Sequence, residues 1–180
     1  IPGYCARIHP GGAKINPESI HKAIDGTLNR MKTNYLDLWM FHRDDTSHDV
    51  GPLVDALNKE VDDGRIRAFG GSNWTTKRIQ DCNDYASSKN KIGMSGSSPQ
   101  FSLAKAKEPY WPDTVVTDDK DKKWFEENNF LLVAWSSLGR GFFAKGEKDF
   151  TEDQDLVRVF YSEENFERKK RAIELADKKN

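Results

Sequence analysis

Residues 35–45 read YLDLWMFHRDD, and this stretch decides the fold class. Its first part, residues 35–41, is mostly apolar and rich in aromatic side chains, which is typical of a short buried β-strand. The strand ends in a polar cluster that begins with His42. The rest of the chain repeats this unit, an apolar strand with polar residues at its carboxyl end.

A helix is predicted immediately before this strand. Asn16 is a favourable N-cap, Pro17 suits the first helical position, and Glu18 places an acidic side chain in the first turn. From Ile20 to Met31, apolar residues recur at spacings of three and four, which is the pattern of a helix with one buried face.

The alternation of helix and strand continues along the chain. Further helices are predicted at residues 52–63, 75–88, 117–128 and 165–179, and further strands at residues 66–70, 92–97 and 130–135. Regular alternation indicates parallel strands joined by right-handed crossovers. Two α/β architectures satisfy it, the open doubly wound sheet and the closed barrel.

Neither common nucleotide-binding motif is complete. Gly139 and Gly141 begin a GxG pair, but the third glycine of GxGxxG is missing. Gly141 and Gly146 have the glycine spacing of a phosphate-binding loop, but Glu147 stands where that loop needs lysine. The open dinucleotide-binding sheet therefore has no support from motifs.

The composition is that of a globular protein of balanced charge. The 180 residues include 28 Lys and Arg against 29 Asp and Glu, for a net charge of −1, so no basic excess indicates nucleic-acid binding. No run of about 18 apolar residues indicates a membrane span. Cys5 and Cys82 are too few for a disulfide framework, which favours reduced thiols and a cytoplasmic location. The length suits a single domain over residues 1–180.

Polar or aromatic side chains stand at the carboxyl ends of all four predicted strands. They are His42, Ser72, Gln100 and Trp135, at successive intervals of 30, 28 and 35 residues. In a barrel, the carboxyl ends of the strands meet at the face that holds the active site, so we expect these side chains to converge on one cavity. Ordinary interpretations also exist: His42 as a hydrogen-bonded loop residue, Ser72 with Asn73 as an N-cap pair for the next helix, and Trp135 as a core residue.

Four segments together resemble the aldo-keto reductase family. They are LDLWMFHRDD (36–45), GRIRAFGGSNW (64–74), SSPQFSL (97–103) and VAWSSLGRGFF (133–143), which occur in the family's order. The resemblance implies a (β/α)8 TIM barrel, incomplete here with about four β/α units. It also implies an oxidoreductase that binds NADPH, with NAD as the alternative, and that reduces aldehydes and ketones to alcohols or catalyses the reverse.

The resemblance assigns roles to individual residues. His42 matches the catalytic histidine, which orients the substrate carbonyl. Ser72, Asn73 and Gln100 match the residues that hydrogen-bond the nicotinamide carboxamide, and Trp135 matches the aromatic residue that stacks on the nicotinamide ring. The cofactor pyrophosphate is expected to contact the loop that contains Ser136, Leu138 and Gly141, in which Ser137 replaces the usual proline.

The family's catalytic Asp, Tyr and Lys are not matched. The Asp and Tyr are expected upstream of residue 1, and Ala6 or Arg7 falls at the position of the Lys, where a guanidinium is a different donor. Tyr4 has no spacing that supports it as a substitute acid. The last strand and the loop for the 2′-phosphate are expected downstream. We therefore interpret the chain as an internal piece of a reductase, inactive alone, whose open sheet edges favour self-association.

Two other functions compete with this interpretation. One is a catalytically inactive nicotinamide-binding or regulatory module of the same family. The other is a metal-dependent barrel hydrolase that uses His42, Asp44 and Asp45, but no second histidine ends another strand, so no metal is expected. The substrate is expected to be a small carbonyl or alcohol compound. The loop at residues 99–117 is expected either to line the substrate side or to cover the cofactor.

Overall fold

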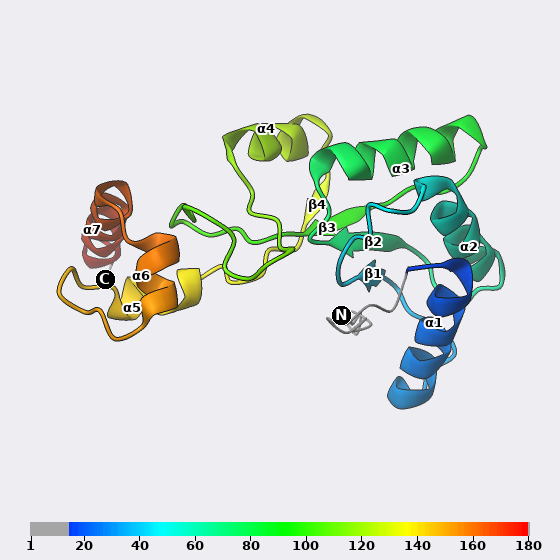
Figure 1. Ribbon diagram of the computed structural model, residues 1–180, viewed down its shortest axis with the longest axis horizontal. Helices are drawn as coiled ribbons and strands as arrows, with labels where there is room; N and C mark the ends of the chain where they lie inside the picture. Colours follow the sequence, from blue (N-terminus) through cyan, green and yellow to red (C-terminus); the bar gives the residue numbers. More distant parts are fainter. Residues whose placement is uncertain (1–14, 180) are drawn as a thin grey trace. The chain divides into compact units, whose positions relative to one another are not determined.

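The computed structural model describes residues 15–179 and shows the predicted alternation of helices and strands (Figure 1). The first eight elements are α1 (Pro17–Met31), β1 (Trp39–Phe41), α2 (Val50–Asp62), β2 (Phe69–Ser72), α3 (Thr76–Ser88), β3 (Gly96–Ser98), α4 (Asp119–Glu127) and β4 (Leu131–Leu132). They are followed by the 3₁₀ helix η1 (Gly139–Gly141) and by the helices α5 (Phe142–Lys145), α6 (Gln154–Phe160) and α7 (Glu163–Asp177). None of the helices described is long and apolar enough to cross a bilayer.

The described residues form two compact units, each with its own hydrophobic core. The first unit extends to Ser98 and includes Lys123–Val133. The second unit consists of Pro99–Lys122 and the chain from Ala134 onward.

The first unit contains a parallel sheet with strand order β1-β2-β3-β4. In register, Met40 lies opposite Gly70, Gly70 opposite Gly96, and Gly96 opposite Leu131. The predicted parallel α/β sheet is therefore confirmed, and consecutive strands are neighbours throughout the described part of it.

Several strand boundaries differ from the prediction. β2 begins at Phe69 instead of residue 66, and β4 covers only Leu131–Leu132 of the predicted residues 130–135. β1 starts at Trp39 because Leu36 pairs with Ile66 only as an isolated bridge. β2 runs to Ser72, so the predicted strand end at residue 70 was wrong, and Ser72 is the last residue of its strand rather than a residue beyond it. A run of apolar residues predicts which side chains are buried. The ends of a strand depend instead on where its backbone pairs with the adjacent strand.

β3 begins at Gly96 instead of residue 92, because side chains satisfy the preceding backbone. Asn58 accepts from the N–H of Ile92 and donates to its C=O, both at 2.9 Å. Asn83 accepts from the N–H of Met94 at 2.7 Å and donates to its C=O at 3.3 Å. Each carboxamide supplies one acceptor and one donor and so replaces a neighbouring strand.

The sheet and three helices build the core of the first unit. Figure 1 shows α1, α2 and α3 along the sheet, and α2 contacts both of the others. The strands bury Trp39, Phe41 and Phe69, and the helices bury a complementary apolar set: Ile20, Ile24, Leu53, Leu57, Ile79 and Cys82. The Cys82 thiol is free and buried, and burial raises its pKa to about 12. Cys5 lies outside the described residues.

The predicted starts of α1 and α3 are confirmed. Asn16 accepts a hydrogen bond from the N–H of Ser19, and the Ser19 hydroxyl accepts one from the N–H of Asn16, which completes a capping box. Pro17 is the first helical residue. Thr75 caps α3 by accepting from the N–H of Arg78 at 3.2 Å.

The second unit has a separate aromatic core built largely from elements that periodicity did not predict. Phe142 of α5 and Phe160 of α6 are fully buried, with ring centroids 6.3 Å apart. α7 begins at Glu163, two residues before the predicted start, because Ser162 caps it by accepting from the N–H of Asn165. Short helices such as α5 and α6 have too few turns to show a periodic apolar stripe.

Candidate functional site

The ends of β1 and β2 are joined by the predicted carboxamide-binding residues. Asn73 Nδ2 donates to the carbonyl oxygen of His42 at 3.1 Å and to Ser72 Oγ at 3.0 Å. Ser72 Oγ in turn donates to the carbonyl oxygen of Ser98 at 2.8 Å. Asn73 has φ +60°, a left-handed conformation that asparagine tolerates better than most residues. Ser72 and Asn73 therefore lie beside the backbone of His42, and the predicted convergence of the four strand-end side chains stays a prediction.

The ordinary interpretation of Ser72 and Asn73 as the N-cap of the next helix was wrong. Thr75 performs that function, and Trp74 anchors the turn between them. The Trp74 indole is buried, stacks on Phe41 with ring centroids 5.1 Å apart, and donates from Nε1 to the carbonyl of Arg43 at 3.1 Å. The polar residues at the end of β2 are thus held in place by the tryptophan that follows them.

Arg78 of α3 organises the loop that follows β1. Its Nε donates to Asp44 Oδ2 at 3.1 Å, and its Nη2 donates to the backbone carbonyls of Asp45 and His48. Burial raises the pKa of the Asp44 carboxyl, and the Arg78 guanidinium offsets part of that rise. Asp44 therefore serves as the partner of an arginine. Within residues 15–179, no group of three or more His, Cys, Asp or Glu side chains is arranged to hold a metal ion.

Gln100 and Trp135 lie on adjacent segments of the second unit. They are paired as a parallel bridge, and Gln100 pairs on its other side with Val116. Trp135 N–H donates to the carbonyl of Pro99 at 3.1 Å, and Thr117 N–H donates to the carbonyl of Gln100 at 3.0 Å. Residues opposite each other in a parallel ladder point to the same face, so the side chains of Gln100 and Trp135 share one side of it.

The orientation of the Gln100 carboxamide follows from its neighbour. Its Oε1 accepts from the N–H of Tyr110 at 3.3 Å, which identifies this atom as the oxygen because a backbone N–H requires an acceptor. Gln100 is 2% exposed, and its Nε2 has no hydrogen-bond partner among the described residues. The indole Nε1 of Trp135 is also buried and has none there. Two buried donors thus stand on one face of the ladder.

Trp135 is packed against an aromatic residue of the 99–117 loop. The Trp111 indole stacks on it with ring centroids 5.6 Å apart and an interplanar angle of 30°. The Arg140 guanidinium lies 4.8 Å from the Trp111 ring centroid and 4.5 Å from that of Tyr110. The loop at residues 99–117 was expected to line the substrate side or to cover the cofactor, but the stack of Trp111 on Trp135 was not predicted, because no local pattern indicates it.

The predicted pyrophosphate loop has an unusual backbone. Ser136, Gly139, Arg140 and Gly141 all have positive φ, from +53° to +92°. Leu138 has φ −91° and ψ 17°, a turn conformation, and is followed by left-handed Gly139. The N–H of Gly139 donates to the carbonyl of Ser136 at 2.8 Å, so this amide already has a partner within the loop.

Gln100 also borders a cavity of about 290 Å³ in the second unit. Its wall includes the basic side chains Lys105 and Arg168. Lys105 Nζ lies 3.0 Å from Asp119 and 3.3 Å from Glu164, and Glu164 also pairs with Arg168 at 2.9 Å. Carboxylates therefore balance these cations, and the cavity wall has no strong positive charge.

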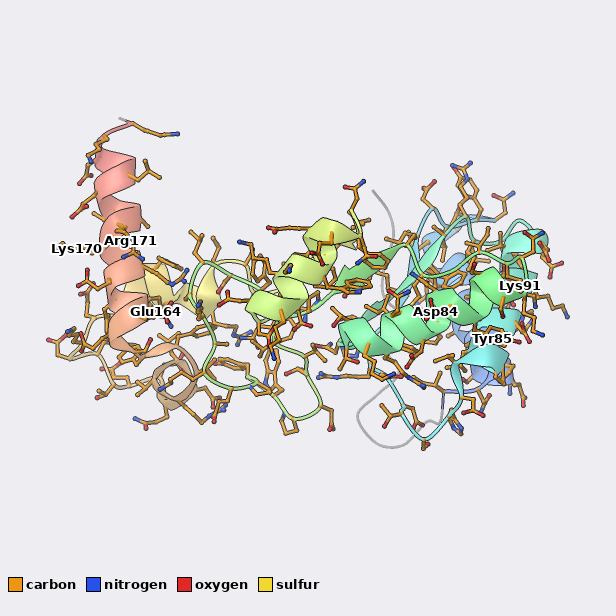
Figure 2. The ribbon with its side chains drawn as sticks, turned by 90° about the horizontal axis from the view of Figure 1, so that it is seen from above. Asp84, Tyr85, Lys91, Glu164, Lys170 and Arg171 are labelled. Carbon is orange, nitrogen blue, oxygen red and sulfur yellow. The ribbon has the colours of Figure 1, made fainter. Side chains whose placement is uncertain are left out.

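One Asp–Tyr–Lys group exists in the described structure, but its electrostatics are wrong for a general acid. Tyr85 donates to Asp55 Oδ2 at 2.9 Å, and Lys91 donates to Asp55 Oδ1 at 2.5 Å. Figure 2 labels Tyr85 and Lys91, which belong to α3 and to the segment that follows it. The hydrogen bond to Asp55 raises the pKa of Tyr85, whereas a catalytic tyrosine needs a lowered pKa. The positions considered for catalytic replacements, Tyr4, Ala6 and Arg7, lie outside the described residues.

The parallel sheet and the crossover helices define an α/β protein, and its partial sheet resembles part of a (β/α)8 barrel in the comparison that follows. The chain is similar to the glycerol dehydrogenase AKR11B4 from Gluconobacter oxydans, with a TM-score of 0.60 and 22% identity over 86% of this chain and 44% of that one. The Aldo/keto reductase family matches residues 5–180. The chain belongs to the aldo/keto reductase family.

Relatives within this family have different named functions. A 6-dehydroglucose reductase of Novosphingobium aromaticivorans is 30% identical over 69% of this chain and 37% of its own length. The aldo-keto reductase yakc of Schizosaccharomyces pombe, whose name specifies NADP(+), is 27% identical over 91% of this chain and 46% of its own length. A probable voltage-gated potassium channel subunit beta of Oryza sativa is 26% identical over 52% of this chain and 29% of its own length. The chain thus spans less than half of these relatives.

Proposed function

We propose that this chain is the nicotinamide-binding part of an NADP-dependent oxidoreductase that reduces aldehydes or ketones to alcohols, or catalyses the reverse. The observation that carries the proposal is the buried Gln100 Nε2, a donor without an acceptor among the described residues, beside the Trp135 indole. A buried donor is costly unless an acceptor reaches it. The carboxamide oxygen of a nicotinamide is such an acceptor, and an indole suits the flat ring attached to it.

The role of each residue in this proposal is taken from the resemblance to the family. Gln100, Ser72 and Asn73 would hydrogen-bond the carboxamide, and Trp135 would support the ring. His42 would orient the substrate carbonyl and stabilise the negative charge that develops on its oxygen. NADPH, when bound, would supply the hydride for the carbonyl carbon. Rigid positioning contributes much of the rate of such a transfer.

The phosphate side of the cofactor is assigned to residues 136–141. The backbone of Ser136, Leu138 and Gly141 is proposed to contact the pyrophosphate because this loop matches the family's pyrophosphate-contacting segment. The N–H groups of Gly139 and Gly141 donate to Ser136 and Leu138 within the loop, so these two amides would have to exchange partners. NADP is the proposed cofactor because the relative yakc is named for it. NAD is the alternative cofactor. Displacement of bound NADPH by a similar concentration of NAD would favour NAD, and failure of NAD to displace NADPH would favour NADP. The cytoplasmic location stays a prediction.

Titration calorimetry of the whole chain with NADPH tests the cofactor site. Gln100→Leu keeps the approximate size of the side chain but removes the buried donor and the acceptor of the Tyr110 N–H, so we expect it to weaken NADPH binding about tenfold or more. Gln80→Leu is the matched control, because Gln80 bonds only to Asp84 on α3. Equal affinity of the Gln100→Leu variant and the original chain would contradict the proposal.

Turnover by the chain alone is expected to be absent. A proton donor must accompany the hydride, and the one described tyrosine with Asp and Lys neighbours has a raised pKa. Incubation with NADPH and 4-nitrobenzaldehyde measures this, and cofactor oxidation above the rate in buffer would show that another group supplies the proton.

A regulatory role is the second candidate, favoured by the similarity to the potassium channel subunit beta of Oryza sativa. Under this alternative the chain would bind NADPH, and a longer protein that contains it would not turn over carbonyl compounds. Turnover by that longer protein is therefore the measurement that separates the two functions.

A further inference from the structure

The indole of Trp135 has two faces, and one of them is occupied. Trp111 stacks on it at 5.6 Å between ring centroids, nearly parallel at 30°. A flat ligand can therefore stack on Trp135 from the opposite face only, as long as Trp111 stays in place. Aromatic pairs of this kind contribute stabilisation beyond the burial of their surface, and they restrict the tilt of both rings.

Trp111 is itself held from several directions. Its carbonyl accepts from the Thr114 hydroxyl at 2.7 Å, which closes a tight turn. The preceding residue, Tyr110, is 7% exposed, and its N–H is bonded to Gln100 Oε1. The guanidinium of Arg140 lies over both the Tyr110 and the Trp111 rings. Trp111 is thus positioned even though 41% of its surface is exposed.

The same contacts connect the two proposed nicotinamide residues. Gln100 holds the backbone of Tyr110 through its Oε1, and this leaves its Nε2 directed elsewhere. Trp111 follows Tyr110 directly and stacks on Trp135. The loop at residues 99–117 therefore sets both the orientation of the Gln100 carboxamide and the plane of the Trp135 indole.

We propose that Trp111 is a positioning residue for the nicotinamide site, which supports the Trp135 indole from behind so that the cofactor ring stacks on its opposite face. The proposal rests on the proposed function and adds a residue to it. The competing alternative is that Trp111 occupies the face that the cofactor needs and must move away before binding. The NADPH affinity of Trp111→Ala decides between the two.

The stack itself is tested without any cofactor. Two stacked indoles give an exciton couplet in circular dichroism, so we expect the couplet in the original chain and its loss in both Trp111→Phe and Trp135→Phe. The variant Tyr35→Ala is the matched control, because Tyr35 is a similarly exposed aromatic residue under an arginine, with Arg67 at 4.3 Å from its ring. Absence of the couplet from the original chain would overturn the proposal whether or not NADPH binds.

NADPH affinity then tests the role of the stack. Trp111→Ala should weaken NADPH binding about two- to tenfold, the range expected for losing one aromatic contact. Trp111→Phe keeps a ring and should restore most of the affinity, and Tyr35→Ala should leave it unchanged. Unchanged or tighter binding by Trp111→Ala overturns the proposal, and tighter binding identifies Trp111 as a group that blocks the site. If the couplet is present but neither the original chain nor any variant binds NADPH, the proposed function fails, and the role of Trp111 in cofactor binding fails with it.

Discussion

At the scale of single residues, Gly70 shows how closely β2 and β3 approach. A Cβ atom at this position would lie 2.2 Å from the carbonyl oxygen of Gly96, a backbone atom that cannot move away without shifting the strand. The next atoms in its way are the Gly96 carbonyl carbon, at 3.0 Å, and the Met40 methyl, at 3.2 Å. A side chain larger than hydrogen therefore cannot fit between these strands.

Gly70→Ala is expected to lower the free energy of unfolding by about 3 kcal/mol or more, because it overpacks a site bounded by backbone. Gly26→Ala is the matched control. Gly26 lies within α1, and a Cβ there would meet only the flexible end of Arg30, at 3.1 Å. That substitution should raise stability by about 0.5–1 kcal/mol through helix propensity. Urea unfolding measures both, and equal effects of the two substitutions would contradict this account.

At the scale of secondary-structure elements, three buried or half-buried asparagines connect helices to loops. Asn58 holds Ile92 and Asn83 holds Met94 in the first unit. In the second unit Asn165 accepts from the N–H of Lys105 and donates to its carbonyl, both at 2.8 Å. Each of these side chains satisfies both backbone groups of one loop residue, which allows the loop to pack against a helix without forming a strand.

Asn165 is the most deeply buried of the three and also donates to the carbonyl of Phe160 at 2.7 Å. Asn165→Ala should therefore lower the free energy of unfolding by about 3 kcal/mol, because buried backbone groups lose their partners. Asn29→Ala, at an exposed position of α1, should change it by less than about 0.5 kcal/mol. A loss below about 1 kcal/mol for Asn165→Ala, measured by urea unfolding, would mean that water replaces these bonds.

At the scale of the whole molecule, the sheet has exposed apolar surface. Leu131 is 52% exposed and Val133 is 45% exposed, and Leu131 shares its register with Gly96 and Gly70. Among the described strands, β1 and β4 each have only one neighbour. Unpaired strands and exposed apolar faces are the features through which chains associate.

We therefore expect concentration-dependent self-association of the chain at about micromolar to millimolar concentrations. Sedimentation velocity measures it. Leu131→Lys should shift the distribution toward the monomer, because it places a charge on the apolar face. Ile173→Lys is the control, since Ile173 is also half exposed but lies on α7 in the second unit. A monomer at all concentrations, or equal effects of both variants, would argue against association through the sheet.

Much of the fold could be predicted from local signals. The N-cap at Asn16 and the helix start at Pro17 depend on residues within one turn of one another, and both appear as expected. The cap at Thr75 is equally local, but Ser72 and Asn73 were considered for it instead. The position of Ser72 inside β2 and the start of β3 at Gly96 could not be predicted, because they depend on backbone partners elsewhere in the chain. Helix starts can thus be predicted from short sequence motifs, whereas the ends of a strand are set by pairing with adjacent strands.

The candidate site also combines residues that the sequence identified with contacts that it could not predict. His42, Ser72, Asn73, Gln100 and Trp135 were identified from their places at strand ends, and their roles remain predictions. The stack of Trp111 on Trp135 joins residues 24 positions apart and has no local signature. The hydrogen bond that orients the Gln100 carboxamide also has no local signature. It forms because the 99–117 loop folds back and brings the Tyr110 N–H to Gln100 Oε1.

By itself, the sequence determined the helix–strand order, the parallel sheet and the family, because periodicity, caps and strand-end motifs are properties of short segments. The tertiary structure alone decided which face of Trp135 is covered, which atom of Gln100 has no partner among the described residues, and which asparagines replace strand neighbours. These features depend on contacts between residues distant in sequence. Only packing brings such groups within the few ångströms over which stacking and hydrogen bonding act.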